Sequence, residues 1–169
     1  MTHPYTSSPT PEAAAAPITR FRDEHRFLSN FWFVPGGVTV AGLTGRTTEH
    51  VFQALKSGTP AEQAQILAAP TPGEAKILGG PAHRGGIITE LRPDWDAIKL
   101  GVMARLQAAK YAVPELAQLL LATGDAELVE GNHWCDTFWG TCTCRSGHDG
   151  EGQNWLGRIL MIQRSVLRA

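Results

Sequence analysis

The sequence lacks an excess of charge of either sign. Its 169 residues include 15 Lys and Arg against 16 Asp and Glu, so the formal net charge is −1 at pH 7. A chain this close to neutral has no overall basic field that would hold a nucleic-acid backbone regardless of base sequence. Any contact with a nucleic acid is therefore expected to be local.

Long hydrophobic runs are also absent. No stretch approaches the roughly 20 apolar residues that span a bilayer. The N-terminus has no basic segment followed by an apolar core, which would mark a secretory leader. We therefore expect a cytoplasmic protein without membrane contact.

Cysteine is scarce, and the three residues, Cys135, Cys142 and Cys144, lie close together in the sequence. An odd number is a poor basis for a disulfide framework, so reduced thiols or a metal are expected. With His133 and His148 the segment has enough nitrogen and sulfur for four zinc ligands. It contains no C-x2-C pair, however, and H-x-C and C-x-C spacings on one strand would strain a tetrahedral site. The sequence thus favours small buried thiols over a structural metal, and no cofactor is expected.

Established nucleotide-binding and nucleophile motifs are missing as well. The glycine-rich run at 78–86, L-G-G-P-A-H-R-G-G, contains neither G-x-G-x-x-G nor the Walker pattern. Turn chemistry accounts for most of its glycines, although Arg84, between flexible backbone positions, is a candidate phosphate contact. Ser29 and Cys135 stand in no recognisable Ser/His/Asp or Cys/His order, which argues against those classes of nucleophilic catalysis.

The sequence does contain enough apolar residues for one folded domain. Hydrophobic residues make up 43% of the chain and charged residues 18%, which suits a single globular domain with a sizeable core. Residues 1–17 are rich in Pro, Ser, Thr and Ala and have little to bury. We expect them to form a flexible N-terminal tail, with the domain occupying residues 18–169.

Local patterns in the first half predict short elements. P-G-G at 35–37 predicts a turn, and V-T-V-A-G behind it predicts a short strand. Residues 47–58 predict one helix, which Thr47 or Thr48 can cap and Gly58 can end.

Two capping-box patterns follow this helix. T-P-A-E at 59–62 and T-P-G-E at 71–74 each place proline at the first helical position. Each therefore predicts the start of another helix, the first stopped by Pro70 and the second by 79–81.

Longer helices are predicted in the second half. Apolar residues recur after Asp94 at spacings of 3, 4, 4 and 3, which predicts a helix that packs across the core. Pro114 is expected to open another helix, and 126–131, A-E-L-V-E-G, to add a short strand. The last predicted helix carries Trp155, Ile159, Ile162 and Val166 on one face, with Leu156, Leu160 and Leu167 beside it.

A polar stripe runs along the helix predicted at 47–58. Glu49, Gln53 and Lys56 fall at i, i+4 and i+7. One interpretation is an exposed face whose polar residues support one another weakly. The other is a carboxylate that projects into a cleft, with Lys56 placed to attract an anionic group such as phosphate. The positive helix end should favour the ionised form of Glu49 unless burial reverses that shift.

A second candidate lies in D-T-F-W-G at 136–140. Asp136 stands near an aromatic ring and a flexible backbone position, which a nucleoside-like ligand would need for ribose hydrogen bonds and base stacking. The alternative is a turn residue whose side chain bonds its own backbone. Residue types alone leave both interpretations open.

Six segments occur in the order seen in NADAR, or YbiA-like, proteins, and the chain is identified as a member of that family from about Phe21 to its end. They are F-L-S-N-F at 27–31, T-E-H-V-F-Q-A-L-K at 48–56, D-W at 94–95, L-L-A-T at 120–123 with L-V-E at 128–130, D-T-F-W-G at 136–140, and N-W-L-G-R-I-L-M at 154–161.

The resemblance implies a single, mostly helical α+β domain with a few short strands, and N-glycosidase activity on ribosylated amines. One associated substrate is ADP-ribose attached to guanine in nucleic acid, removed as the antidote to a DarT-like toxin. Another is the phosphoribosylamino-pyrimidine intermediates of riboflavin synthesis. A module that binds NAD or ADP-ribose without hydrolysis is the non-enzymatic alternative.

The resemblance also implies site residues. The expected catalytic residues are Glu49, Asp136 and Lys56, and the expected substrate-binding residues are Asn30, Phe31, Gln53, Arg84, Trp95, Trp139 and Gly140, with Asn154 supporting the loop. Family members often have Arg directly after the glycine matched by Gly79, whereas this chain has Gly80 there and Arg84 as the nearest arginine. In the expected mechanism Glu49 stabilises positive charge on the sugar while Asp136 orients water or holds ribose hydroxyls. No metal is required.

Overall fold

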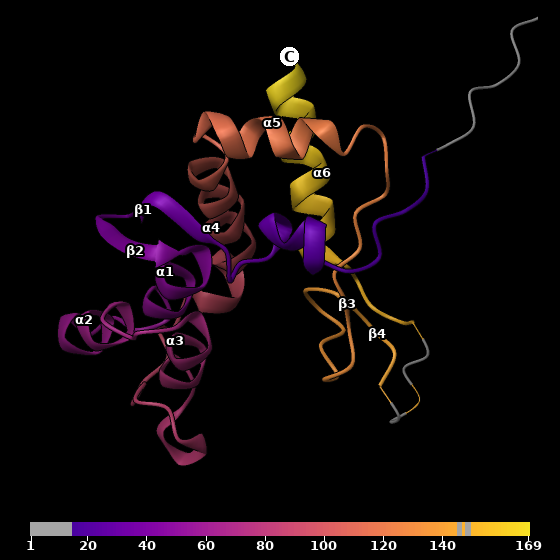
Figure 1. The fold of residues 1–169 in the computed structure, drawn as a ribbon. Coiled ribbons are helices and arrows are strands. Elements are labelled where there is room, and N and C mark those ends of the chain that lie inside the picture. The colour runs from indigo at the N-terminus through magenta and orange to yellow at the C-terminus, as the bar shows by residue number, and fades with distance from the viewer. Residues whose placement is uncertain (1–14, 145–146, 148–149) are drawn as a thin grey trace, which may run out of the picture.

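The computed structural model describes residues 15–144, 147 and 150–169. Most of the segment expected to form a tail lies outside the described residues. The described part is a mostly helical α+β domain with small two-stranded sheets (Figure 1). None of its helices is long and apolar enough to cross a bilayer.

Figure 1 labels the α-helices and the β-strands of the chain. The elements of the described residues, with the two 3₁₀ helices, follow one another in the order given next. They are the short 3₁₀ helix η1 (Asp23–Leu28), β1 (Phe33–Val40), β2 (Leu43–Thr47), α1 (Thr48–Ala54), α2 (Pro60–Leu67), α3 (Pro72–Leu78), η2 (Ala82–Arg84), α4 (Trp95–Lys110), α5 (Pro114–Ala122), β3 (Gly131–Asn132), β4 (Thr141–Cys142) and α6 (Trp155–Arg168).

Strands β1 and β2 form an antiparallel hairpin. The predicted strand V-T-V-A-G is part of β1, but the predicted turn at 35–37 is wrong, because those residues lie inside β1 at an irregularity in its pairing. Gly36 and Gly37 have φ of 76° and 81°, a conformation that glycine adopts without steric cost. Strand β2 was not predicted, and it ends at Thr47, where α1 begins.

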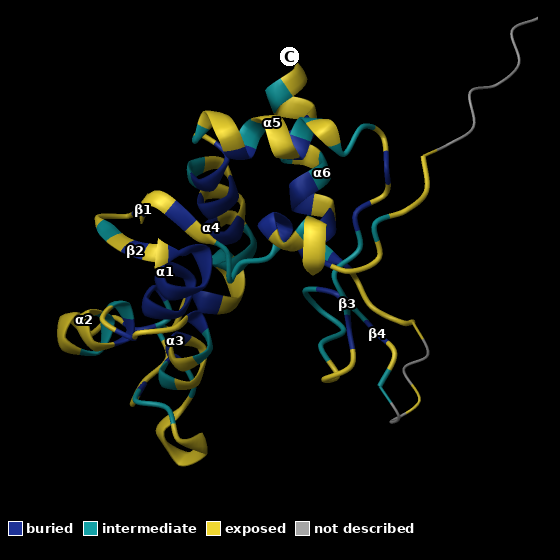
Figure 2. Ribbon diagram, in the orientation of Figure 1, coloured by how far each residue is buried: buried dark blue, intermediate teal, exposed yellow. Residues whose placement is uncertain are grey.

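Helix α1 is buried along its whole length, as Figure 2 shows. Thr47 caps it and accepts a hydrogen bond from the backbone nitrogen of His50 at 3.3 Å. The helix was predicted to end at Gly58, but it ends at Ala54. The interpretation of its polar stripe as an exposed face is therefore wrong for Glu49 and Gln53, which are 6% and 4% exposed.

The two predicted capping boxes differ. Thr71 and Glu74 form the reciprocal box at the start of α3, as predicted. Thr59 makes no side-chain cap at the start of α2. Glu62, the expected partner, instead accepts hydrogen bonds from the hydroxyls of Ser57 at 2.5 Å and Thr89 at 2.8 Å. Partners outside the helix have displaced the local motif.

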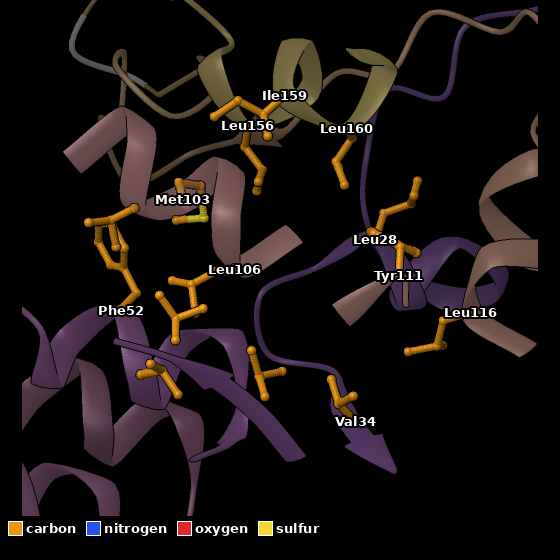
Figure 3. Close-up of a cluster of buried hydrophobic side chains, with 14 of the residues drawn as sticks. Leu28, Val34, Phe52, Met103, Leu106, Tyr111, Leu116, Leu156, Ile159 and Leu160 are labelled. Atoms are coloured by element: carbon orange, nitrogen blue, oxygen red, sulfur yellow. The ribbon is translucent and has the colours of Figure 1, made fainter. Parts of the chain in front are cut away.

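The main core lies where α1, α4 and α6 meet (Figure 3). Helices α4 and α5 match the predicted segments. The predicted apolar face of α6 is wrong at its C-terminal end, because Ile162 and Val166 are 64% and 62% exposed. The neighbouring stripe of Leu156, Ile159 and Leu160 points into the core instead.

The segment 126–131 was expected to be a strand, but only its last residue, Gly131, belongs to a strand, and Leu128 forms an isolated bridge. Leu128 pairs with Ile18 in a parallel bridge, and the backbone nitrogen of Val129 donates to the carbonyl of Ile18 at 2.8 Å. Strand β3 begins at Gly131 and pairs in parallel with β4. This arrangement places Glu130 between the bridge and the small sheet.

The burial of Leu160 on α6 leads to a prediction about the stability of the fold. Leu160→Ala should lower the free energy of unfolding by about 2–5 kcal/mol, because it leaves a cavity in the core. Ile162→Ala, two residues along the same helix, should change it by less than about 0.5 kcal/mol. Urea unfolding of both variants measures this difference, and equal losses would contradict the observed orientation of the helix.

Candidate functional site

A cleft of about 720 Å³ lies beside the core, within the usual size of a small-molecule site. Residues from η1 and the turn after it, from α1, α3, α4 and α6, and from the loop between β3 and β4 line it. Seven of the residues predicted from the sequence are among them: Asn30, Phe31, Glu49, Gln53, Lys56, Asp136 and Trp139. The fold thus gathers side chains from segments far apart in the chain.

Three predicted substrate-binding residues do not line this cleft. Arg84 is exposed on η2. Trp95 is buried behind Phe52, with 5.0 Å between the ring centroids, so it supports a lining residue from the core side. Gly140 packs so closely on the carbonyl of Glu130 that a Cβ atom would overlap that oxygen. Glycine at this position therefore allows its backbone to pass close to that of Glu130.

The carboxylate of Glu49 is held inside the cleft by its neighbour one turn along α1. The Gln53 side-chain nitrogen donates to Glu49 Oε1 at 2.7 Å. Burial raises the pKa of Glu49 above its usual value, although the Gln53 bond and the charges of Lys76 and Lys56 oppose the shift. The expectation that the helix end would favour the ionised form is therefore reversed by burial, as the sequence analysis allowed.

Two lysines flank this carboxylate. Lys56 lies 5.7 Å from the centre of the Phe52 ring, and burial lowers its pKa while the charge of Glu49 opposes the shift. Lys76, on α3, lies 5.6 Å from the ring of Trp134. Lys76 and Trp134 both line the cleft and were not predicted. No local motif marks either residue, because α3 and the β3–β4 loop meet only in the folded chain.

Glu130 is a further carboxylate in the cleft and was also missed. Burial, followed by the charge of Asp136, raises the pKa of Glu130 to about 7. Its Oε2 is enclosed and has no hydrogen-bond partner among the described residues. Asn154 holds the backbone here, accepting from the Glu130 nitrogen at 3.0 Å and donating to the Leu128 carbonyl at 2.8 Å. The L-V-E segment at 128–130 was the available sequence signal.

Asp136 is both a turn residue and a residue of the cleft. Its Oδ1 accepts from the backbone nitrogens of Phe138 at 3.1 Å and Trp139 at 2.8 Å. The Asn132 side chain donates to the Asp136 carbonyl at 2.7 Å and accepts from the Asp136 backbone nitrogen at 3.1 Å. Because both hydrogen bonds to the carboxylate end on Oδ1, Oδ2 is the oxygen available to a ligand.

Polar side chains of α4 fix the wall of the cleft that Ser29 and Asn30 form. Gln107 donates to Asn30 Oδ1 at 2.7 Å, and Lys110 donates to the carbonyl of Ser29 at 2.8 Å. The Asn30 carbonyl in turn accepts from the backbone nitrogen of Glu49 at 3.0 Å. These bonds join α4, the turn after η1 and α1 into one support.

Cationic side chains make the cleft suitable for an anionic ligand. Arg22 and Arg26 line it together with Lys56 and Lys76. Phosphate groups are bound in proteins by such clusters, where arginine offers paired donors and lysine a point charge. The cleft therefore combines four carboxylates, aromatic walls and four cations.

A sequence model of the NADAR domain matches residues 18–168. The chain belongs to the NADAR domain family. It is 35% identical over 146 residues to the N-glycosidase YbiA of Escherichia coli, covering 86% of this chain and 83% of that protein. It is 36% identical over 140 residues to an N-glycosidase of Nostoc punctiforme, covering 80% and 83% of the two chains.

Longer NADAR proteins are similar too. The chain is 37% identical over 147 residues to a riboflavin biosynthesis protein of Vibrio vulnificus, but spans 36% of its length. Among solved structures, the NMR structure of E. coli YbiA matches with a TM-score of 0.73 and 33% identity, covering 93% of this chain and 88% of that one. The fold of this NADAR domain is thus the YbiA fold.

The raised pKa of Glu130 predicts that the stability of the fold depends on pH. The folded state binds a proton on Glu130 up to about pH 7, whereas its ordinary pKa is 4.5. The stability contributed by Glu130 is therefore present at low pH and lost as the pH rises through about 7. Glu130→Gln cannot ionise at this position. Between pH 6 and pH 8, its free energy of unfolding should therefore rise by about 1 kcal/mol relative to that of wild type.

Urea unfolding of wild type and Glu130→Gln at both pH values measures this gain. Glu115→Gln, on the exposed first turn of α5, is the matched control and should show no such change. A constant difference between wild type and Glu130→Gln at the two pH values would mean that Glu130 titrates like a solvent-exposed acid.

Proposed function

We propose that this NADAR domain is an N-glycosidase that hydrolyses a ribosyl C–N bond, and that its substrate is ADP-ribose attached to guanine in nucleic acid. It would then act as the antidote to a DarT-like ADP-ribosyltransferase. Two observations support this: relatives that cover most of the chain are named N-glycosidases, and the cleft carries acids and cations together.

The observation that carries the proposal is the buried carboxylate of Glu49 between two lysines. Breaking a ribosyl C–N bond builds positive charge on C1′ and the ring oxygen, so a fixed carboxylate beside that carbon lowers the barrier. The Gln53 hydrogen bond and the charges of Lys56 and Lys76 all favour the ionised form of Glu49 against its burial. In this mechanism Glu49 is the charge-stabilising group.

A departing base nitrogen needs a proton, and Glu130 is suited to supply it. With a pKa of about 7 it is protonated in a large share of molecules near neutral pH, as a general acid must be. Asp136 then uses Oδ2 to orient the attacking water or to hold a ribose hydroxyl.

The rest of the cleft matches the other parts of an ADP-ribosyl nucleotide. Lys56, Lys76, Arg22 and Arg26 would contact the diphosphate. Trp139 and Phe31 would provide flat apolar surface against a base. Because the net charge is −1, no overall basic field would hold a nucleic acid, and these four cations of the cleft would recognise the modified nucleotide locally.

A second candidate substrate is a phosphoribosylamino-pyrimidine intermediate of riboflavin synthesis. The observation that favours it is the name of the Vibrio vulnificus relative and of a maize chloroplast relative, both riboflavin biosynthesis proteins. The chain spans 36% and 20% of those proteins. The same carboxylates would cleave either substrate, because both have an amine on C1′ of a phosphorylated ribose.

Glu49→Gln keeps the shape of the side chain and removes its charge. It should lower the rate of ADP-ribose release from ADP-ribosylated guanosine by about a hundred- to a thousandfold, because one preorganised electrostatic group is worth that much. Chromatographic measurement of free ADP-ribose gives the rate. Glu115→Gln should match wild type. A Glu49→Gln rate within about threefold of wild type would remove Glu49 from the catalytic role.

Initial rates on three substrates identify the reaction. ADP-ribosylated guanine in a single-stranded oligonucleotide should be cleaved faster than the phosphoribosylamino-pyrimidine at equal concentration. The same modified guanine should be cleaved faster in a single strand than in a duplex, because a paired base must first be extruded. The reverse order between the first two would favour the riboflavin intermediate. Tight binding of ADP-ribose without any release would indicate a binding module and refute hydrolysis.

A further inference from the structure

The three cysteines converge in the fold, which their sequence spacing did not predict. Their sulfur atoms all lie within 4.8 Å of one another. Cys142 belongs to β4, Cys144 follows it, and Cys135 comes from the loop after β3. Only Cys142 is buried, so the expectation of small buried thiols is wrong for Cys135, which is exposed, and Cys144, which is half-buried. His148, the second predicted histidine, lies outside the described residues.

The sulfur of Cys142 is surrounded by hydrogen-bond donors. The backbone nitrogens of Cys135 and Cys144 each donate to it at 3.2 Å. These bonds hold the sulfur of Cys142 against the backbone of both other cysteines. The thiolate is the form of cysteine that binds metals.

Cys135 has a backbone conformation that a metal site would explain. Its φ is 65°, in the left-handed region that a residue with a side chain rarely adopts. The sulfur of Cys135 lies 2.8 Å from that of Cys144. Zinc bound at about 2.3 Å in a tetrahedral site holds its sulfur ligands about 3.8 Å apart. The sulfurs of Cys135 and Cys144 would therefore have to separate by about 1 Å to bind one zinc ion together.

We propose that Cys135, Cys142 and Cys144 form a zinc site. Three thiolates are soft ligands, which select zinc over magnesium or calcium. Each thiol loses its proton when it binds the metal. The exposure of Cys135 gives the ion a path from solvent, and water or a further side chain completes the fourth position.

The site would brace the loop that carries part of the catalytic cleft. Cys135 is bonded in sequence to Asp136 and follows Trp134, both of which line the cleft. Asn132 already ties the Asp136 backbone to β4 by donating to the Thr141 carbonyl at 3.0 Å. A metal joining Cys135 to Cys142 and Cys144 would add a second tie between the same two segments.

Metal analysis of the whole chain, purified under reducing conditions without chelator, tests the proposal. We expect one zinc per chain, and cobalt substitution should give thiolate-to-cobalt charge-transfer bands and the visible bands of a tetrahedral site. Cys135→Ser and Cys144→Ser should each weaken zinc binding at least about 100-fold, because the loss of an outer-shell partner alone costs 10- to 100-fold. These two exposed or half-buried positions keep the test valid if Cys142→Ser fails to fold.

Thr143→Ala is the matched control, since Thr143 lies between two of the cysteines and its exposed side chain carries no sulfur. It should keep the zinc and the cobalt spectrum. The proposal is overturned if the reduced protein titrated with zinc or cobalt takes up neither metal. It is also overturned if the single cysteine variants bind zinc as tightly as wild type. Both results can be read without an activity assay, so they are independent of the proposed glycosidase.

Discussion

The complete burial of α1 is the constraint on which the cleft depends. The helix has seven residues, all of them buried, whereas isolated helices shorter than about 12–15 residues are marginal in water. Its neighbours therefore hold it: the His50 ring lies between Thr47 Oγ1 at 2.8 Å and the Ala69 carbonyl at 3.1 Å. Because the helix cannot turn, Glu49 stays in the cleft and away from water. An exposed helix of the same sequence would leave this carboxylate an ordinary surface acid.

Two buried polar side chains tie the end of α4 to the segment around the end of η1. Lys110 and Tyr111 at the end of α4 donate to the carbonyls of Ser29 and Phe27 at 2.8 Å and 3.2 Å, and burial lowers the pKa of Lys110 to about 7. Unpaired, such groups would each cost free energy, so their bonds fix the turn after η1 in one position. Polar groups that stabilise the fold thereby position one wall of the site.

Elements whose causes are local were predicted well. Proline and threonine patterns placed the starts of α3 and α5, and apolar periodicity placed α4, since neighbours a few residues apart decide these features. Elements that depend on distant partners were not. Glu62 bonds Ser57 and Thr89 in place of its expected cap. The exposure of Ile162 and Val166 reflects which face of α6 packs against its neighbours. The same reason hid Lys76 and Glu130, whose roles arise only where α3, the segment before β3 and α1 meet.

The sequence by itself determined the family, the order of the longer helices and the identity of seven residues of the cleft, because ordered motifs and local patterns are written along the chain. The tertiary structure alone decided the chemical state of those residues. Burial raises the pKa of both Glu49 and Glu130, and the approach of β4 to the loop after β3 gathers three sulfurs. Solvent exclusion and contact between distant segments exist only after folding, and they set charge, proton affinity and ligand geometry.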